Sequence, residues 1–433
     1  MHQPIRQGRS WGRRFRRREW LDRSWLVVPS LYVLAALALG KAVPALETGN
    51  EVDPLGLALS TDSAREILNA VAGGMIAFTG LVVSVAVVVV QFGAGQYTPR
   101  LVLRFRRDLV VKHALGIFIA PALYALVALA QLGSGADLEP NLTVGLAVLL
   151  LVAAVLAFFA LVARLLDLLR PRRLFEQLLA GCERAIDQVY PRAYGDEQPG
   201  PVAEQLPAVT ATVVHEGPEG VVSALDLPRL LSLAAEADAV VEAGPVVGSF
   251  LWRGAPLVHV RGTVRAIPDA QLERAIIVSD ERTLAQDPAF AIRATVDIAI
   301  RALSPAVNDP TTACQALDTL ESLLHRLAGR ALGPGRLHDT GGALRVLYRA
   351  PGWDELLTLA LTEIRHYGAS SHQTARRTRA LIQGLEPVVP AERAGAVREQ
   401  LALLDAAVAA AFPDPAERAV ASVADHMGLG GVG

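Results

Sequence analysis

Residues 142–166 read LTVGLAVLLLVAAVLAFFALVARLL, a continuous apolar stretch with a single charge, Arg164, close to its end. A helix of about 20 apolar residues crosses the roughly 30 Å hydrocarbon core of a bilayer, so this stretch predicts a transmembrane helix. Three further runs of the same character precede it, at Ser24–Leu46, Leu68–Val90 and Ala114–Leu132. The sequence therefore predicts a four-helix transmembrane domain over residues 24–170, preceded by a basic segment over residues 1–23.

The composition of the whole chain agrees with this interpretation. Of its 433 residues 52% are hydrophobic, and the mean hydropathy is +0.35. Soluble proteins of this size rarely reach such a mean, because polar groups must cover their surface. The formal net charge is −2, so no bulk charge attracts nucleic acid. No lysine follows Lys112, which excludes a Walker A loop or a Schiff-base lysine from the rest of the chain.

Basic and acidic residues alternate between the connections of the predicted spans. Arginines dominate the N-terminal segment, the connection between the second and third spans, and the residues after the fourth span, whereas the other two connections are acidic. Cytoplasmic loops of membrane proteins carry the excess of Lys and Arg. We therefore expect a multi-pass protein of a bacterial inner membrane with both termini in the cytoplasm. The arginines beside the first span are expected to contact anionic lipid headgroups rather than RNA.

The second predicted span carries small or weakly polar residues at alternating steps of three and four positions, which places them on one helix face. This small-residue stripe consists of Gly73, Ala77, Gly80, Ser84, Val87, Gln91 and Gly95. Small residues let helices approach closely in lipid, so helix packing is one interpretation of the stripe. The lining of a pore in a homo-oligomer is the other. No Asp or Glu lies within a predicted span, which argues against a proton-coupled pump.

Beyond the spans the pattern changes from helix to strand and back. Residues 171–207 read as a helix followed by a linker, residues 208–265 as a small β-rich module, and residues 266–433 as a helical domain. The expected fold class is therefore a membrane α-helical domain of four spans followed by a cytoplasmic α+β region.

Two Asp-Pro pairs, Asp287-Pro288 and Asp309-Pro310, predict helix starts in the helical domain. The first of these helices carries Arg293, Asp297 and Arg301 at four-residue steps among apolar residues, which predicts a buried and paired row of charges. A structural network and a ligand or regulatory site are both compatible with this row. The candidate residues of this region are Arg282, Asp287, Arg293, Asp297, Arg301, Ser304, Asn308 and Asp309.

A basic cluster follows, and it fits either ordinary helix surface charge or an anion site; its residues are Arg365, His366, Tyr367, His372, Arg376, Arg377 and Arg379. The sequence motifs HExxH, CxxC and GxSxG are absent, as is a GxGxxG before a helix. We therefore assign no catalytic residue, no metal ligand and no cofactor, and an enzyme is the less favoured class.

The stretch ERTLAQDPAF at residues 281–290, with DIAIRALSPAVNDPTTA at residues 297–313, resembles the signature of the DUF2254 family of predicted bacterial membrane proteins. QYTPR at residues 96–100 and RHYGAS at residues 365–370 resemble further motifs of that family. The resemblance covers nearly the whole chain. It implies several N-terminal spans and a cytoplasmic C-terminal domain, and it implies no biochemical activity. This chain has Ala306-Val307 where the family pattern implies Gly before an aliphatic residue, which puts in doubt only a tight glycine turn there.

Three functions remain open on the sequence. The first is an oligomeric channel or transport-related protein whose cytoplasmic part regulates or assembles it. The second is a membrane-tethered sensor or scaffold that conducts nothing. The third is an enzyme with an unrecognised site around Arg293, Asp297, Asn308 and Asp309. Ion flux through the purified protein would separate the first from the other two.

Overall fold

The computed structural model describes residues 26–47, 59–96, 108–132, 140–168, 170–196, 206–263 and 265–430. The chain divides at residue 170 into two compact units. We call the first the membrane unit and the second, from residue 171 onward, the C-terminal unit, and describe each by itself.

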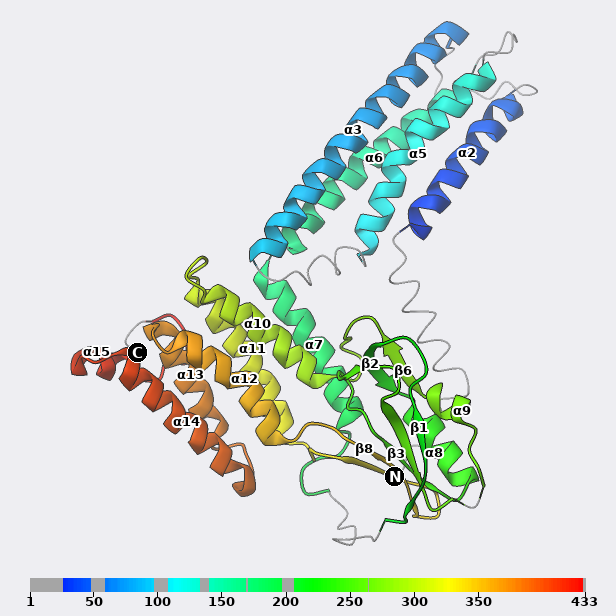
Figure 1. Cartoon of the computed structure of the whole chain (residues 1–433). Helices are drawn as coiled ribbons and strands as arrows, with labels where there is room; N and C mark the ends of the chain where they lie inside the picture. The colour runs from blue at the N-terminus through cyan, green and yellow to red at the C-terminus, as the bar shows by residue number, and fades with distance from the viewer. Residues whose placement is uncertain are drawn as a thin grey trace. The chain divides into compact units, whose positions relative to one another are not determined.

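The membrane unit contains α2 (Val27–Glu47), α3 (Thr61–Gln96), α5 (Leu109–Leu132) and α6 (Asn141–Leu168), shown in Figure 1. All four are long and apolar enough to cross a membrane, so the four helices predicted from the sequence are confirmed. Helix α5 packs against the other three. A Cβ at Gly116 would lie 2.4 Å from the ring of Tyr32, so a glycine is required where α2 and α5 approach most closely.

Polar side chains join the ends of these helices. Glu47, the last residue of α2, is buried and accepts hydrogen bonds from the backbone N–H groups of Leu142 and Thr143. A carboxylate from another helix thus satisfies the free N–H groups at the start of α6. At the other end of α6, Arg164 pairs with Asp108 at 2.7 Å, and Asp108 also accepts from the N–H of Val110 at the start of α5. Arg164, the one charge in the apolar stretch at residues 142–166, is therefore paired.

The C-terminal unit begins with α7 (Pro171–Val189) and contains two β-sheets. The five-stranded sheet has the order β1-β5-β3-β8-β7, with β1 at Val209–Val214, β5 at Pro256–Arg261, β3 at Val240–Ala243, β8 at Leu344–Tyr348 and β7 at Gly335–His338. The three-stranded sheet has the order β4-β2-β6, with β4 at Phe250–Leu251, β2 at Gly220–Leu225 and β6 at Ile276–Ser279. Two short helices, α8 (Leu227–Glu236) and α9 (Asp269–Glu273), accompany the sheets.

The rest of the C-terminal unit is helical. Its helices are α10 (Pro288–Ala302), α11 (Pro310–Ala328), α12 (Trp353–Gly368), α13 (His372–Leu385), α14 (Ala391–Ala411) and α15 (Pro415–Ala421). Helix α10 packs against α7, α11 and α12. The residues Asp287 and Asp309 cap α10 and α11, as the two Asp-Pro pairs predict.

The sheets extend beyond the module expected at residues 208–265. Strands β6, β7 and β8 lie within residues 266–433, which the sequence pattern assigned to a helical domain. Strand β8 is parallel to β3, with Val346 opposite Val241, while β7 pairs with β8 in an antiparallel hairpin. Such short strands are stabilised by neighbours distant in the chain, so their own five or fewer residues give a weak local signal.

Candidate functional sites

The small-residue stripe faces away from its own helix bundle. Gly73, Ala77, Gly80, Ser84, Val87 and Gln91 are all exposed, and no atom lies within 4 Å of the place where a Cβ would stand on Gly73 or Gly80. The opposite face of α3 carries Leu68, Met75 and Val82, which are buried in the bundle. Gly95 is in α3, but its surroundings lie outside the described side chains. Among the described residues nothing packs on the stripe from Gly73 to Gln91, which leaves it available to lipid or to another molecule.

The predicted charge row is held by a partner that the sequence pattern did not identify. The Arg293 Nε donates to Asp297 Oδ1 at 2.6 Å, and Arg293 Nη2 donates to Glu363 Oε2 of α12 at 2.8 Å. These carboxylates, that of Glu363 foremost, raise the pKa of Arg293 above its ordinary value. The Arg293 and Asp297 side chains are 24% and 28% exposed and Arg301 is half-buried, so the row that the sequence predicts to be buried is half-buried in this chain. It ties α10 to α12, which is a structural task.

The turn after α10 contains three further candidates. Ser304 Oγ donates to the Arg301 carbonyl at 2.6 Å, and Asn308 has a φ of +48°. The positive φ falls on Asn308 and not on Ala306, so this turn needs no glycine at residue 306. Asp309 accepts from the Thr312 N–H and from the Thr312 hydroxyl, so each of its oxygens has a donor.

The remaining candidates, Arg282 and Asp287, lie at the other end of α10. Asp287 Oδ1 accepts from the N–H of Phe290 at 2.9 Å, while Arg282 Nε donates to the Gly248 carbonyl at 2.7 Å. The Asp287 side chain is buried, and its Oδ2 has no hydrogen-bond partner among the described residues. Burial raises the pKa of Asp287 to about 6, against the opposing effects of the Phe290 N–H and the Arg282 charge.

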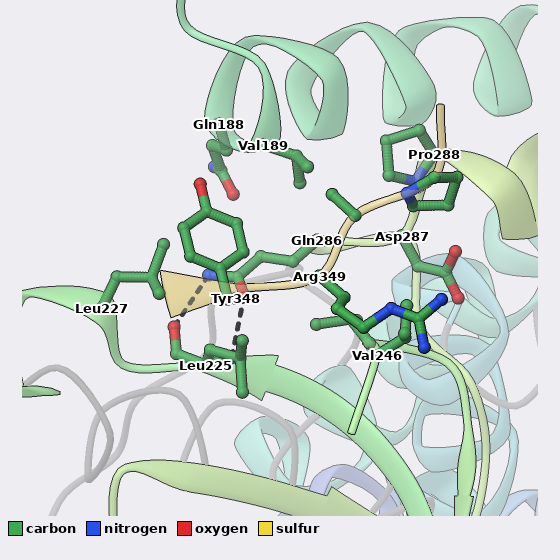
Figure 2. A pocket seen from close by; sticks show the side chains of 13 residues that line it. Gln188, Val189, Leu225, Leu227, Val246, Gln286, Asp287, Pro288, Tyr348 and Arg349 are labelled. Atoms are coloured by element: carbon green, nitrogen blue, oxygen red, sulfur yellow. Dashed lines mark hydrogen bonds between the residues drawn. The ribbon is translucent and has the colours of Figure 1, made fainter. Parts of the chain in front are cut away.

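A small pocket of about 30 Å³ adjoins Asp287 (Figure 2). Its wall includes Val189 of α7, Leu225 of β2, Tyr348 of β8 and Gln286, whose side chain donates to and accepts from the Leu225 backbone. Of the eight candidates in this region, only Asp287 lines this pocket. The eight residues are therefore spread over the two ends and the middle of α10, a helix about 22 Å long, and do not form one site.

The three arginines of α13 in the basic cluster do not form an open anion site. Arg376, Arg377 and Arg379 are buried. Arg376 donates to the carbonyls of Val423 and Gly430, each at 3.1 Å, Arg377 pairs with Asp318 at 2.8 Å, and Arg379 pairs with Asp405. These arginines hold the C-terminal residues and the neighbouring helices together. Among the residues that the structure describes, no group of three or more His, Cys, Asp or Glu side chains is arranged to hold a metal ion.

The four apolar helices and the mixed α+β unit that follows them in the sequence define a multi-pass membrane protein. The chain belongs to the DUF2254 family of predicted membrane proteins, whose model matches residues 22–384. Uncharacterised proteins of Mycobacterium bovis and Mycobacterium tuberculosis are 28% identical to it over 422 residues, which covers 93% of this chain and 79% of each relative. No solved structure matches the chain.

Proposed function

We propose that the protein is a homo-oligomeric channel or transport-related protein of the bacterial inner membrane, with the C-terminal unit as its cytoplasmic regulatory part. The observation that carries this proposal is the outward direction of the small-residue stripe on α3. The arginine-rich connections favour the orientation with both termini inside.

The chemistry of the stripe fits a protein neighbour better than lipid. The exposed faces of α2 and α6 present large apolar side chains such as Leu34 and Phe159, whereas the stripe presents two glycines, the Ser84 hydroxyl and the Gln91 amide. Gln91 follows the end of the predicted span, and within the span the Ser84 hydroxyl donates to the Gly80 carbonyl at 2.9 Å. The glycines, which would allow the close approach of a second copy, are therefore what favours a protein neighbour.

Several copies around one axis would leave a passage along the same stripe. Small side chains leave room for water, and the hydroxyl and amide supply groups that replace part of an ion's hydration. Arg100 and Arg104 follow the stripe in the sequence, where positive charge would raise the local anion concentration. We therefore infer a path for small ions that prefers anions.

Cysteine cross-linking tests the contact between copies. Cys182 and Cys314 are replaced by serine, and Ala77→Cys is compared with Val85→Cys in native membranes. Both positions are exposed on α3, but Val85 lies about 80° from Ala77 around the helix, off the stripe. Ala77→Cys should give a cross-linked dimer under mild oxidation and Val85→Cys should not. Equal cross-linking at both positions would place the contact elsewhere.

Flux from liposomes tests conduction. Gly80→Leu and Ser84→Leu should reduce the efflux of small anions, while Val85→Leu should leave it unchanged. If Ala77→Cys cross-links but the purified protein releases no more ions than empty vesicles do, at any voltage or membrane tension, the protein is a non-conducting scaffold or sensor. If flux is unchanged by Gly80→Leu and Ser84→Leu, α3 is a packing helix and does not line the path.

A further inference from the structure

Two of the Asp-Pro caps of the C-terminal unit, Asp287 before α10 and Asp309 before α11, differ in one respect that has a chemical consequence. Asp309 uses both carboxylate oxygens, because Thr312 supplies an N–H and a hydroxyl. The equivalent residue after Asp287 is Phe290, which supplies only its N–H, at 2.9 Å. Asp287 Oδ2 is therefore left buried without a donor, although the Asp287 side chain is only 4% exposed.

Gly248 lies between this oxygen and the Arg282 guanidinium. A Cβ built on Gly248 would lie 2.3 Å from Asp287 Oδ2 and 3.3 Å from Arg282 Cζ, so the two groups already occupy the place where a side chain would stand. Arg282 donates to the Gly248 carbonyl, and Asp287 Oδ2 accepts no hydrogen bond from it among the described residues. Because Arg282 is exposed, its guanidinium can move without disturbing the core.

The other groups around Asp287 do not neutralise it. Cys182 faces it from α7, Tyr190 from the residue after that helix and Tyr348 from β8, and the pocket wall adds Arg349, which is exposed. Burial raises the pKa of the Cys182 thiol to about 12 and raises the pKa of both tyrosine hydroxyls, so all three stay uncharged near neutral pH. Of the two exposed arginines, Arg282 is the one whose charge acts on the Asp287 carboxyl and lowers its pKa, so it is the cation placed to respond to the charge on Asp287.

The adjoining pocket is too small for an organic ligand. A volume of about 30 Å³ holds one or two water-sized groups, and its wall is mostly apolar. A proton is small enough to bind Asp287 Oδ2 without any rearrangement of the surrounding side chains.

We propose that Asp287 is a proton-operated switch, whose protonation decides whether the Arg282 guanidinium rests on the Gly248 carbonyl or on the Asp287 carboxylate. With Asp287 neutral, Arg282 stays on Gly248, as the structure has it. With Asp287 charged, the exposed guanidinium turns from the Gly248 carbonyl to the neighbouring Oδ2 and pairs with it, which leaves the Gly248 carbonyl without this donor. Residues 280–287 join β6 to α10, so the change alters the link between the three-stranded sheet and α10. The switch does not depend on whether the protein conducts ions.

The sign of the pH dependence follows from the direction of the shift. The pKa of Asp287 is about 6 in the folded chain and 3.8 for an ordinary Asp. The contribution of protonated Asp287 to the stability of the folded chain is therefore fully present below about pH 4 and is lost as the pH rises through about 6.

The test uses the full chain in detergent, with thermal unfolding measured from pH 5 to pH 8. The wild type should lose at most roughly 5 °C in its midpoint over this interval beyond any change shared by all variants, because the pairing of Arg282 with the charged carboxylate offsets part of the loss. Asp287→Asn keeps a side chain that caps helices well but cannot ionise, so its midpoint should lack this loss. The matched control Asp309→Asn, at the satisfied sister cap, should keep the loss of the wild type. If Asp287→Asn retains the full loss, Asp287 is not the switch.

Arg282→Gln tests the second half of the proposal. Glutamine can still donate to the Gly248 carbonyl but cannot neutralise a carboxylate, so its midpoint should fall further than that of the wild type as the pH rises. Hydrogen exchange of the peptide covering residues 246–249 gives a local readout. After correction for the intrinsic rate, its exchange should be faster at pH 7.5 than at pH 5.5 in the wild type, because the loop loses its bond to Arg282, and independent of pH in Asp287→Asn. A wild-type response in Arg282→Gln, or no local change in exchange, would refute the movement of Arg282.

Discussion

At the scale of single residues, the charges of the C-terminal unit act in shared networks. Arg293 binds two carboxylates, from its own helix and from α12, through hydrogen bonds of 2.6 and 2.8 Å. Removing one carboxylate therefore leaves Arg293 with a partner. This differs from an isolated buried pair, where removal of one member typically costs 3–5 kcal/mol.

We predict that Asp297→Ala destabilises the full chain by only about 1–2 kcal/mol, because Glu363 remains and the side chains of the pair are a quarter exposed. Glu363→Ala should have a similar or smaller effect. The double variant should lose more than the sum of the two, since Arg293 then has neither of these carboxylates. Chemical denaturation of the three variants measures this. A single variant as unstable as the double variant would show that one of the carboxylates contributes nothing.

Arg393 shows a different use of a buried cation. Its guanidinium donates to the carbonyls of Ala328 and Arg330, each at 2.8 Å, where α11 ends, and it lies between the rings of Tyr194 and Trp353. A lysine cannot reproduce a planar group with several donors. Arg393→Lys should therefore lower stability by roughly 1–3 kcal/mol, whereas Arg398→Lys, at an exposed position of the same helix, should change it little. Equal midpoints for the two variants in thermal unfolding would contradict this role.

At the scale of helices, the start of α6 depends on a residue nearly a hundred positions earlier. The buried carboxylate of Glu47 accepts from two N–H groups and the hydroxyl at the first turn of α6. Glu47→Ala should lower the stability of the membrane unit by about 1–3 kcal/mol, because those donors lose their acceptor. Glu66→Ala, an exposed glutamate of α3, is the control. The thermal midpoint in detergent is the measurement, and no difference between the two variants would show that water replaces the cap.

At the scale of the whole molecule, orientation in the membrane is the prediction that conditions the others. The arginine distribution predicts both termini in the cytoplasm. A reporter enzyme that is active only outside the cytoplasm should be inactive when fused after Gly433 and active when inserted at residues 49–53. The opposite pattern would reverse the topology and place the C-terminal unit, with Asp287, outside the cell.

Local patterns in the sequence were sufficient for the four membrane helices and for the starts of α10 and α11. A membrane span needs only one long apolar run, and an Asp-Pro cap acts on N–H groups within three residues, so neither depends on the rest of the fold. The resemblance to the DUF2254 signature could also be recognised from the sequence, because the signature lies in one part of the chain.

Only the tertiary structure decided which groups meet. Glu363 joins Arg293 across 70 positions, and β8 joins β3 across about a hundred, and no local periodicity records such choices. The direction of the stripe on α3 was open for a further reason. In lipid both faces of a helix are apolar, so polarity does not tell which face enters the bundle. The unusual surroundings of Asp287 could not be predicted either. The sequence shows only a good helix cap, whereas the fold shows that the second carboxylate oxygen is buried beside Gly248 without a donor.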